Sequence, residues 1–190
     1  MKIKKNITAS IASIKSREKS LKITVNSLIN QVDHLNIYLN NYDKIPFFLT
    51  GNPKINIMRS QDFKDLGDIG KFYWANSIKG YHFTCDDDLI YPPNYISYMI
   101  RKLKKYNGFI SCHGAIFKKP FISFYKSKKN FSFKNDLIHD KVVNILGTGL
   151  LAYDADKIKI PLSIFKHKNM ADVFIAVYAK KNNIQCIVVE

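Results

Sequence analysis

Three consecutive carboxylates, Asp86, Asp87 and Asp88, directly follow the apolar stretch Tyr81–Cys85 and shortly precede a Pro-Pro pair. Alternate side chains of an extended chain share a face, so we expect Asp86 and Asp88 to converge and Asp87 to point away. Two carboxylates in a dry site repel each other, and a divalent cation removes that cost. Mg²⁺ and Mn²⁺ prefer oxygen ligands and are commonly held by one or two carboxylates plus substrate phosphates. The triplet therefore predicts a metal site for a phosphate-bearing substrate, the alternative being a solvated turn that complements the next helix dipole.

Strands and helices that alternate along the chain must position this triplet. We expect strands at residues 6–13, 35–40, 55–58, 81–85, 108–114, 147–154 and 184–189, and amphipathic helices within 14–32, 92–106 and 169–183. For the last helix we expect an apolar face of Val173, Phe174, Val177 and Tyr178. This order predicts an α/β, Rossmann-like domain with a mostly parallel, mixed central sheet and helices on both faces. Ligands of such sheets bind beyond the carboxyl ends of the strands, which is where the triplet lies.

The composition limits the classes of partner that this chain could bind. The chain has 190 residues, which suits one domain, and 30 Lys and Arg against 15 Asp and Glu give a net charge of +15. Such an excess suits nucleic acid, an anionic membrane surface or a phosphorylated substrate, and AT-rich coding would also produce it. The basic residues are scattered without interleaved aromatics, so we expect no nucleic-acid partner.

The cysteine count and the absence of long apolar runs indicate a compartment. Three cysteines without a Cys-x-x-Cys pair fit a reducing environment. We find no signal peptide and no run of about 18 apolar residues. We therefore expect a cytoplasmic protein, with peripheral contact at the inner face of the membrane left open. Residues 115–140 are polar, aromatic and basic without a clean period, which predicts a flexible loop or flap.

Several segments together resemble one enzyme family. They are ASIKSRE, YLNNY, GDIGKF, FTCDDDLIYPPNY, LGTGLLAYD and FKHKNMADVFIAVYAKKNNI. In this order and spacing they resemble the family 2 glycosyltransferases of the GT-A fold, of the bacterial surface-polysaccharide type. The resemblance implies a single GT-A domain over residues 1–190. It also implies an inverting transfer, dependent on Mn²⁺ or Mg²⁺, from a nucleotide-diphosphate sugar, UDP-linked, to a saccharide or lipid-linked acceptor.

The resemblance also implies roles for particular residues. The implied metal ligands are Asp88 and Asp86. The implied contacts to the nucleotide sugar are Ser13, Arg17, Asn40, Asn41, Asp68, Lys71, Asp86 and Asp87. Asp172 matches the catalytic base that takes the proton of the acceptor hydroxyl, on the face opposite the leaving diphosphate. The alternative for Asp172 is a plain helix start, because Asn169 is a good N-cap and acidic residues favour the first turn.

Other interpretations stay open. A nucleotidyltransferase would use similar metal chemistry, but the segment ASIKSRE lacks the glycines of a phosphate-binding loop. A non-catalytic basic module for an anionic membrane or nucleic acid is the third hypothesis. His113, His139 and His167 could bind metal or acceptor or be ordinary surface residues, and Gly147 and Gly149 could admit the acceptor or form a plain turn. Relatives often continue beyond the last strand with a metal-binding His, whereas this sequence stops at Glu190. We therefore expect one of three arrangements: a third metal ligand from elsewhere, a site completed by water and phosphate, or a catalytic core that lacks a C-terminal extension.

Overall fold

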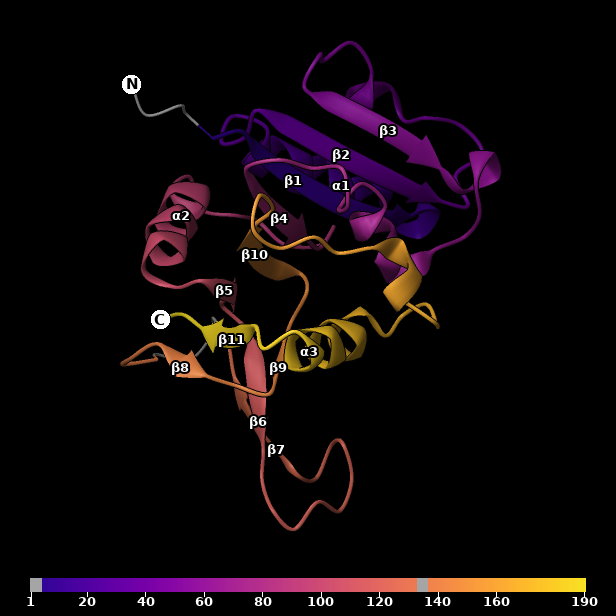
Figure 1. Cartoon of the computed structure of the whole chain (residues 1–190). Helices are drawn as coiled ribbons and strands as arrows, with labels where there is room; N and C mark the ends of the chain where they lie inside the picture. The colour runs from indigo at the N-terminus through magenta and orange to yellow at the C-terminus, as the bar shows by residue number, and fades with distance from the viewer. Residues whose placement is uncertain (1–4, 133–136) are drawn as a thin grey trace.

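An eight-stranded sheet forms the centre of the computed structural model, which describes residues 5–132 and 137–190 (Figure 1). Its order is β3-β2-β1-β4-β10-β5-β11-β8. The strands are β1 (Ile7–Ile14), β2 (His34–Asn40), β3 (Ile55–Arg59), β4 (Tyr81–Cys85), β5 (Gly108–Ser111), β8 (Lys141–Val142), β10 (Leu150–Asp154) and β11 (Gln185–Val188). Strands β3, β2, β1 and β4 are parallel, as are β5 and β11, whereas β10 runs antiparallel to β4 and β5, and β8 to β11. The predicted mostly parallel, mixed sheet is confirmed.

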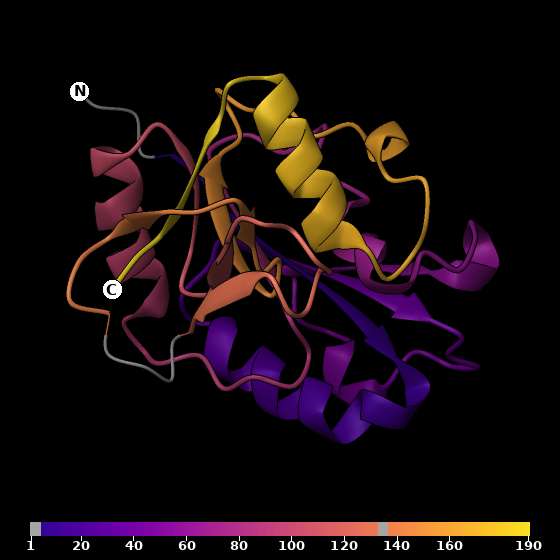
Figure 2. The same cartoon turned by 90° about the horizontal axis from the view of Figure 1, so that it is seen from below.

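Helices cover both faces of the sheet, as predicted. Helices α1 (Glu18–Leu28) and α2 (Tyr95–Lys105) pack on one face, and α3 (Ala171–Lys181) and the 3₁₀ helix η4 (Gly67–Phe72) pack on the other. Figure 2 shows α1 and α3 on opposite sides of the strands. Alternation along the strands produces the two cores: Ile37 and Leu39 of β2 join the α1 side, and Tyr38 joins the α3 side. Short 3₁₀ turns complete the chain: η1 (Lys15–Arg17), η2 (Phe47–Leu49), η3 (Ser60–Asp62) and η5 (Leu162–Ile164).

The buried face of α3 differs from the predicted one. The predicted apolar face was Val173, Phe174, Val177 and Tyr178, but none of these is fully buried and Val177 is 47% exposed. Ala171, Ile175 and Ala179 are buried instead, at helical spacing of four residues. The first turns of α3 are apolar on nearly every side, so periodicity alone does not select a face. Two of the three buried positions are alanines, whose small side chains let a helix lie close to its neighbours.

A chain of polar side chains crosses five neighbouring strands on the α3 face of the sheet. Asn56 donates to Asn36 (3.1 Å), and Asn36 donates to Ser10 Oγ (3.4 Å). Ser10 Oγ lies 2.8 Å from His82 Nε2, and His82 Nδ1 lies 2.6 Å from the Tyr153 hydroxyl. Ser10, His82 and Tyr153 are fully buried, so each needs the partner that the next strand supplies. We call this chain the polar ladder.

A second, three-stranded sheet projects from the main body (Figure 1). Its order is β7 (Lys128–Phe131), β6 (Gly114–Phe117) and β9 (Ile145–Leu146). The prediction of an irregular segment at 115–140 was therefore wrong in part, because β6 and β7 form an antiparallel hairpin within it. Residues 133–136 of that segment lie outside the described residues. In the described part of the chain, no helix has the length and apolar character needed to span a bilayer.

Candidate active site

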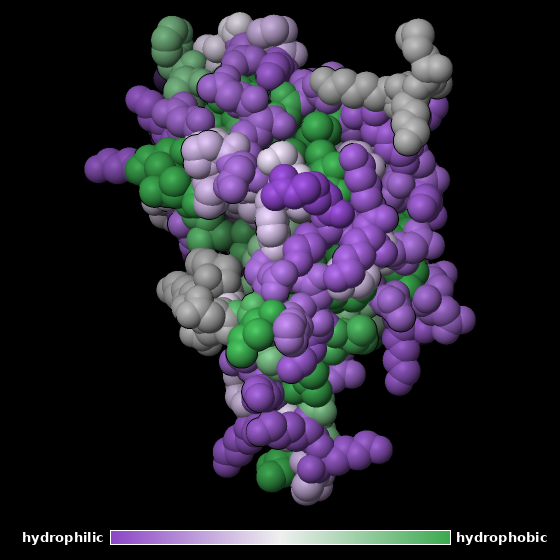
Figure 3. Space-filling view, turned by 90° about the vertical axis from the view of Figure 1, so that its left-hand side faces the viewer, coloured by the Kyte–Doolittle hydropathy of each residue, from purple (hydrophilic) through white to green (hydrophobic). Residues whose placement is uncertain are grey.

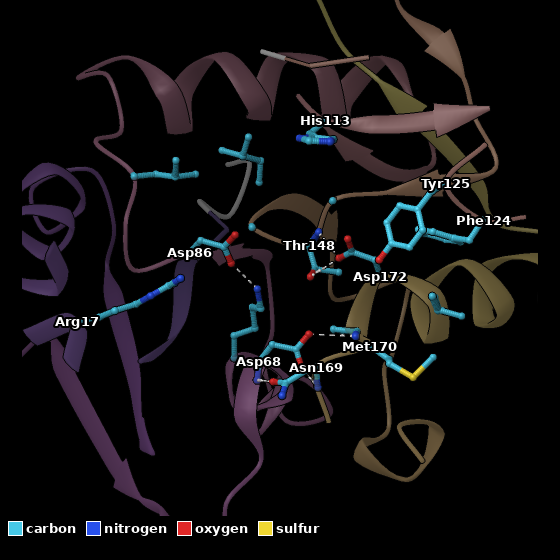
Figure 4. A pocket seen from close by; sticks show the side chains of 17 residues that line it. Arg17, Asp68, Asp86, His113, Phe124, Tyr125, Thr148, Asn169, Met170 and Asp172 are labelled. Carbon is cyan, nitrogen blue, oxygen red and sulfur yellow. Dashed lines mark hydrogen bonds and ion pairs between the residues drawn. The ribbon is translucent and has the colours of Figure 1, made fainter. Parts of the chain in front are cut away.

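A cavity of about 870 Å³ opens beyond the carboxyl ends of β1 and β4 (Figure 4). Five of the residues predicted from the sequence line it: Arg17, Asp68, Lys71, Asp86 and Asp172. They come from η1, η4, the end of β4 and the start of α3, which are far apart in sequence. The fold thus brings charged side chains from four segments to the edge where ligands of α/β sheets bind.

Lys71 and Asp86 form the central ion pair of the cavity. Lys71 Nζ donates to Asp86 Oδ1 at 2.6 Å; the lysine side chain is 4% exposed and the aspartate side chain 44%. Burial alone would lower the pKa of Lys71, but the charge and hydrogen bond of Asp86, with smaller contributions from Asp172 and Asp68, raise it overall. Lys71 is therefore a fixed buried cation beside a carboxylate that still reaches solvent.

The three aspartates of the triplet are divided between two cations. Arg17 Nη1 donates to Asp87 at 2.8 Å and lies 3.2 Å from Asp88, whereas Asp86 binds Lys71. Asp87 is buried and Asp88 is 46% exposed at its side chain. The expectation that Asp87 points away from Asp86 and Asp88 is corrected in one respect, because Asp87 and Asp88 share Arg17. The turn after β4 breaks the strict alternation on which that expectation rested.

The turn at Gly147–Gly149 packs directly against Asp86. A Cβ atom at Gly149 would lie 2.0 Å from Asp86 Oδ2, so no larger residue fits without moving the carboxylate. The Tyr91 hydroxyl donates to the Gly149 carbonyl at 2.7 Å and accepts the Asp86 N–H at 2.9 Å. A turn is therefore present, and the group packed against Gly149 is the Asp86 carboxylate. The approach of an acceptor at this turn stays a prediction.

Asp172 faces the same cavity from the start of α3. Its Oδ1 accepts the Thr148 N–H at 2.8 Å and the Thr148 hydroxyl at 2.7 Å. Within residues 5–132 and 137–190, no hydrogen bond engages Asp172 Oδ2. The side chain is therefore held by one oxygen. Asp172 also lies in the first turn of α3, where an acidic side chain favours a helix start, so its role as a catalytic base stays a prediction.

Asp68 supplies the N-terminal cap of α3 from a distant segment. Its carboxylate accepts the N–H groups of Asn169 at 2.6 Å and Ala171 at 3.0 Å. Asn169 has φ 62° and is not itself the cap, which corrects the expectation for this residue. Asp68 thus fixes the segment that carries Asp172.

Four predicted nucleotide contacts, namely Ser13, Asn40, Asn41 and Asp87, are not among the residues that line the cavity, and neither is the predicted metal ligand Asp88. Asn40 is buried, accepts the N–H groups of Leu66 and Gly67 at 3.1 Å, and donates to the Gly67 carbonyl at 3.0 Å. Ser13 is buried against the Tyr42 hydroxyl at 3.0 Å, whereas Asn41 is exposed with φ 56°. Asn40 ties the end of β2 to η4, so its amide is already committed to the fold.

The acidic side chains suit a divalent metal. Asp86 and Asp88 offer hard oxygen ligands, and each is about half exposed, so substrate phosphates and water can complete the coordination. Across the two described ranges, no three His, Cys, Asp or Glu side chains gather closely enough to hold a metal alone. The chemistry of the donors fits Mg²⁺ or Mn²⁺ bound together with a phosphate substrate.

The three candidate histidines lie in different parts of the structure, and one of them lines the cavity. His113 lines the cavity beside Gly147, so it alone of the three candidates lies in this site. His139 is exposed, and His167 lies near the Phe174 ring, with centroids 6.3 Å apart.

Sequence reasoning missed three contributors to the site. Tyr91 holds the triplet against the glycine turn, and Phe124 and Tyr125 line the cavity from the loop between β6 and β7. Aromatic residues without helical or strand periodicity carry no indication of which cavity they line. Only the tertiary fold reveals it.

Known structures share this fold. No protein-family model matches the chain, and no curated protein matches it by sequence. A nucleotidyl transferase from Methanothermobacter thermautotrophicus has a TM-score of 0.61 and 11% identity, over 97% of this chain and 87% of the other. The 4-diphosphocytidyl-2C-methyl-D-erythritol synthase from Anaerococcus prevotii has a TM-score of 0.56 and 16% identity, over 93% and 84%. These similarities establish a shared α/β fold. The predicted resemblance to family 2 glycosyltransferases is matched by no family model and stays a prediction.

Proposed function

We propose that this chain is a metal-dependent transferase acting on a nucleoside-phosphate substrate, and that it transfers a sugar with inversion from a nucleotide-diphosphate sugar. The observation that carries the proposal is the placement of Asp86 and Asp172 on one cavity, each from a different element (Figure 4). An inverting transfer needs a charge-handling site for the leaving diphosphate and a separate base for the acceptor hydroxyl. The cavity has a candidate for each.

Asp88 and Asp86 would hold Mn²⁺ or Mg²⁺ on the diphosphate side. A bound metal would neutralise charge on the leaving diphosphate. Lys71 is a further cation there, because its ammonium is buried 2.6 Å from Asp86 and its pKa is raised. Arg17 lines the same cavity and also lies beside Asp87 and Asp88. We expect these residues to bind and orient the donor, which we propose is UDP-linked, with Asp87 supporting Arg17.

Asp172 would act on the acceptor side. Thr148 fixes Asp172 Oδ1 with two hydrogen bonds, which leaves Oδ2 to receive the proton of an acceptor hydroxyl. The oxygen of that hydroxyl would then bond to the anomeric carbon as the bond to the diphosphate breaks. We propose a saccharide or lipid-linked acceptor.

The segment after β1 supports glycosyl transfer over nucleotidyl transfer. The turn after β1 is the 3₁₀ segment Lys15–Arg17 without glycine, unlike a glycine-rich phosphate-binding loop.

A nucleotidyltransferase is the second candidate, and the comparisons with solved structures favour it. Both proteins described above carry nucleotidyl-transferring or synthase names and share the fold over most of their length. In that reaction a phosphate of the second substrate would attack the α-phosphate of a nucleoside triphosphate, releasing pyrophosphate. The same carboxylates would hold the metal.

The two candidates release different products, which gives the test. We would first screen nucleoside diphosphates, triphosphates and nucleotide sugars by thermal shift with and without Mn²⁺. Turnover would then be followed as nucleoside diphosphate released from a nucleotide sugar, or as pyrophosphate released from a triphosphate with a sugar phosphate. Pyrophosphate release alone would replace glycosyl by nucleotidyl transfer. Ligand shifts that are the same without metal would contradict both.

Two variants assign the roles within the site. Asp88→Ala should abolish the metal-dependent shift, and binding that survives intact would refute the metal assignment. Asp172→Asn keeps an oxygen that can accept both Thr148 hydrogen bonds, so it should fold and bind the donor but lose transfer. Full activity of Asp172→Asn would remove Asp172 as the base.

A further inference from the structure

The loop between β6 and β7, taken here together with the first two residues of β7, combines basic and exposed apolar side chains. Residues 118–129 contain five lysines and no Asp or Glu. Within them Phe121 is 62% exposed, Ile122 71% and Tyr125 81%. The hairpin projects from the body of the molecule (Figure 1), and the lower projection in Figure 3 shows hydrophobic and hydrophilic side chains side by side.

Internal contacts give this loop a defined shape. Ser127 is buried, and its hydroxyl oxygen accepts the N–H groups of Ile122 at 2.7 Å and Ser123 at 3.2 Å. The centroid of the Phe117 ring lies 5.7 Å from that of the Phe121 ring and 5.6 Å from that of the Phe124 ring. These ring contacts still leave most of the Phe121 and Tyr125 side chains exposed, so their apolar surface points to something outside the chain.

We propose that this loop, residues 118–129, docks the protein on an anionic lipid bilayer. Phe121, Ile122 and Tyr125 would enter the interfacial region, where apolar and aromatic side chains are favourable. The lysines would face the anionic headgroups, each contributing attraction near the surface. The chain carries a net charge of +15, so the rest of the molecule adds to the attraction and does not oppose it.

The same loop borders the candidate active site. Phe124 and Tyr125 line the cavity together with Asp172, as Figure 4 shows. A bilayer that receives the neighbouring Phe121 and Ile122 would therefore lie at the acceptor side of the cavity. This second step rests on the proposed function, and it favours a lipid-linked acceptor over a free saccharide.

Vesicle sedimentation tests the docking surface without nucleotide or metal. We expect the wild-type chain to bind phosphatidylcholine vesicles that contain about one-quarter phosphatidylglycerol, and not phosphatidylcholine alone. The variant Phe121→Ser/Ile122→Ser/Tyr125→Ser should reduce the partition coefficient by at least about tenfold. Phe47→Ser is the matched control, because Phe47 is 90% exposed on η2, outside the loop, and this variant should bind as wild type.

A second pair of variants separates local from total charge. Lys118→Gln/Lys119→Gln/Lys126→Gln should weaken binding by roughly fivefold for each lysine removed. Lys19→Gln/Lys22→Gln/Lys79→Gln makes the same change in net charge at exposed positions elsewhere and should weaken it less. Equal losses in the two lysine variants, or wild-type binding by the serine variant, would overturn the proposal. A competition with single-stranded RNA gives a further test. If the RNA displaces the protein from vesicles and the serine variant binds that RNA as tightly as the wild type does, the surface recognises polyanions in general and the proposal is overturned. Failure here leaves the transfer assay unaffected, so the two proposals fail separately.

Discussion

Gly149 and Asp86 are packed so closely that a methyl group at position 149 would lie 2.0 Å from Asp86 Oδ2. The conformation of the glycine turn and the orientation of this carboxylate are therefore one structural unit. The Tyr91 hydroxyl links the two, because it donates a hydrogen bond to the Gly149 carbonyl and accepts one from the Asp86 N–H. A change at Gly149 should consequently alter the position of the Asp86 carboxylate in the cavity.

Gly149→Ala should displace the Asp86 carboxylate and destabilise the fold by about 1–3 kcal/mol, the usual cost of overpacking. Metal-dependent nucleotide binding should fall with it. Gly147→Ala is the control in the same turn, because the atoms nearest to a Cβ there belong to the His113 side chain, at 3.3 Å, a much milder contact than the 2.0 Å at Gly149. Thermal melting with and without nucleotide and Mn²⁺ measures both effects. Equal behaviour of the two variants would show that Asp86 has room to move.

The Lys71–Asp86 pair should respond unequally to loss of either partner. Asp86→Asn leaves a buried ammonium without its main counter-charge, whereas Lys71→Met leaves a carboxylate that is 44% exposed and can be solvated. We expect Asp86→Asn to cost about 3 kcal/mol more in urea unfolding than Lys71→Met. Both should weaken donor binding. A larger loss of stability in Lys71→Met would contradict this ordering.

Thr148 should matter for turnover more than for donor binding. Its hydroxyl and N–H both donate to Asp172 Oδ1, and hydrogen bonds to a charged group contribute about 1.5–3 kcal/mol. Under the proposed function, Thr148→Val should lower kcat by roughly tenfold to a hundredfold with little change in donor KM. Thr148→Ser keeps both donors and should retain most activity. A donor KM that rises while kcat stays constant would place Thr148 on the donor side instead.

Asp68→Ala should destabilise α3 at its first turn. The carboxylate accepts the N–H groups of Asn169 and Ala171, and loss of a capping side chain typically costs about 1–2 kcal/mol. Asp62→Ala is the control, because Asp62 forms only an exposed ion pair with Arg59 and should cost less than about 0.5 kcal/mol. Chemical denaturation measures the difference. Equal small losses would mean that α3 needs no cap from η4.

Burial of His82 should make the fold sensitive to acid. Burial lowers the pKa of His82 to about 3, whereas the ordinary value is 6.5, so the unfolded chain binds a proton that the folded chain excludes. This contribution to stability is complete above about pH 6.5 and is lost as the pH falls towards 3, at up to about 1.4 kcal/mol per unit. His82→Gln should flatten the dependence of urea midpoint on pH between about 6.5 and 5. An unchanged slope in this variant would assign the effect to other groups.

The sheet and its helices followed from the sequence because alternation and helical spacing were clear in those segments. The Tyr81–Cys85 strand and the helix after the Pro-Pro pair lie where the pattern predicted. The place of Asp86 followed from the sheet itself, because ligands of such sheets bind beyond the carboxyl ends of the strands. Lys71 and Asp172 were predicted only through the resemblance to a known family, and the fold brings both to the same cavity.

What could not be predicted depends on contacts between distant segments. The resemblance implied that Asn40 contacts the nucleotide sugar, but its amide binds the backbone of Leu66 and Gly67. The face of α3 depends on which alanines the sheet accepts, and the cap of that helix comes from Asp68, about a hundred positions earlier. A single sequence gives no indication of such partners.

The polar ladder bears on how the strands find their register. Slipping a strand by one residue turns its apolar side chains to the wrong face, but a slip of two residues restores the alternation, and hydrophobic burial barely distinguishes it. Such a slip would remove Ser10 from between Asn36 and His82 and would leave buried polar groups unpaired, at about 1–3 kcal/mol each. The ladder therefore selects one alignment among those that the apolar pattern permits. Because β1, β4 and their neighbours carry the cavity residues at their ends, the same selection sets how far Arg17 and Asp86 extend into the site.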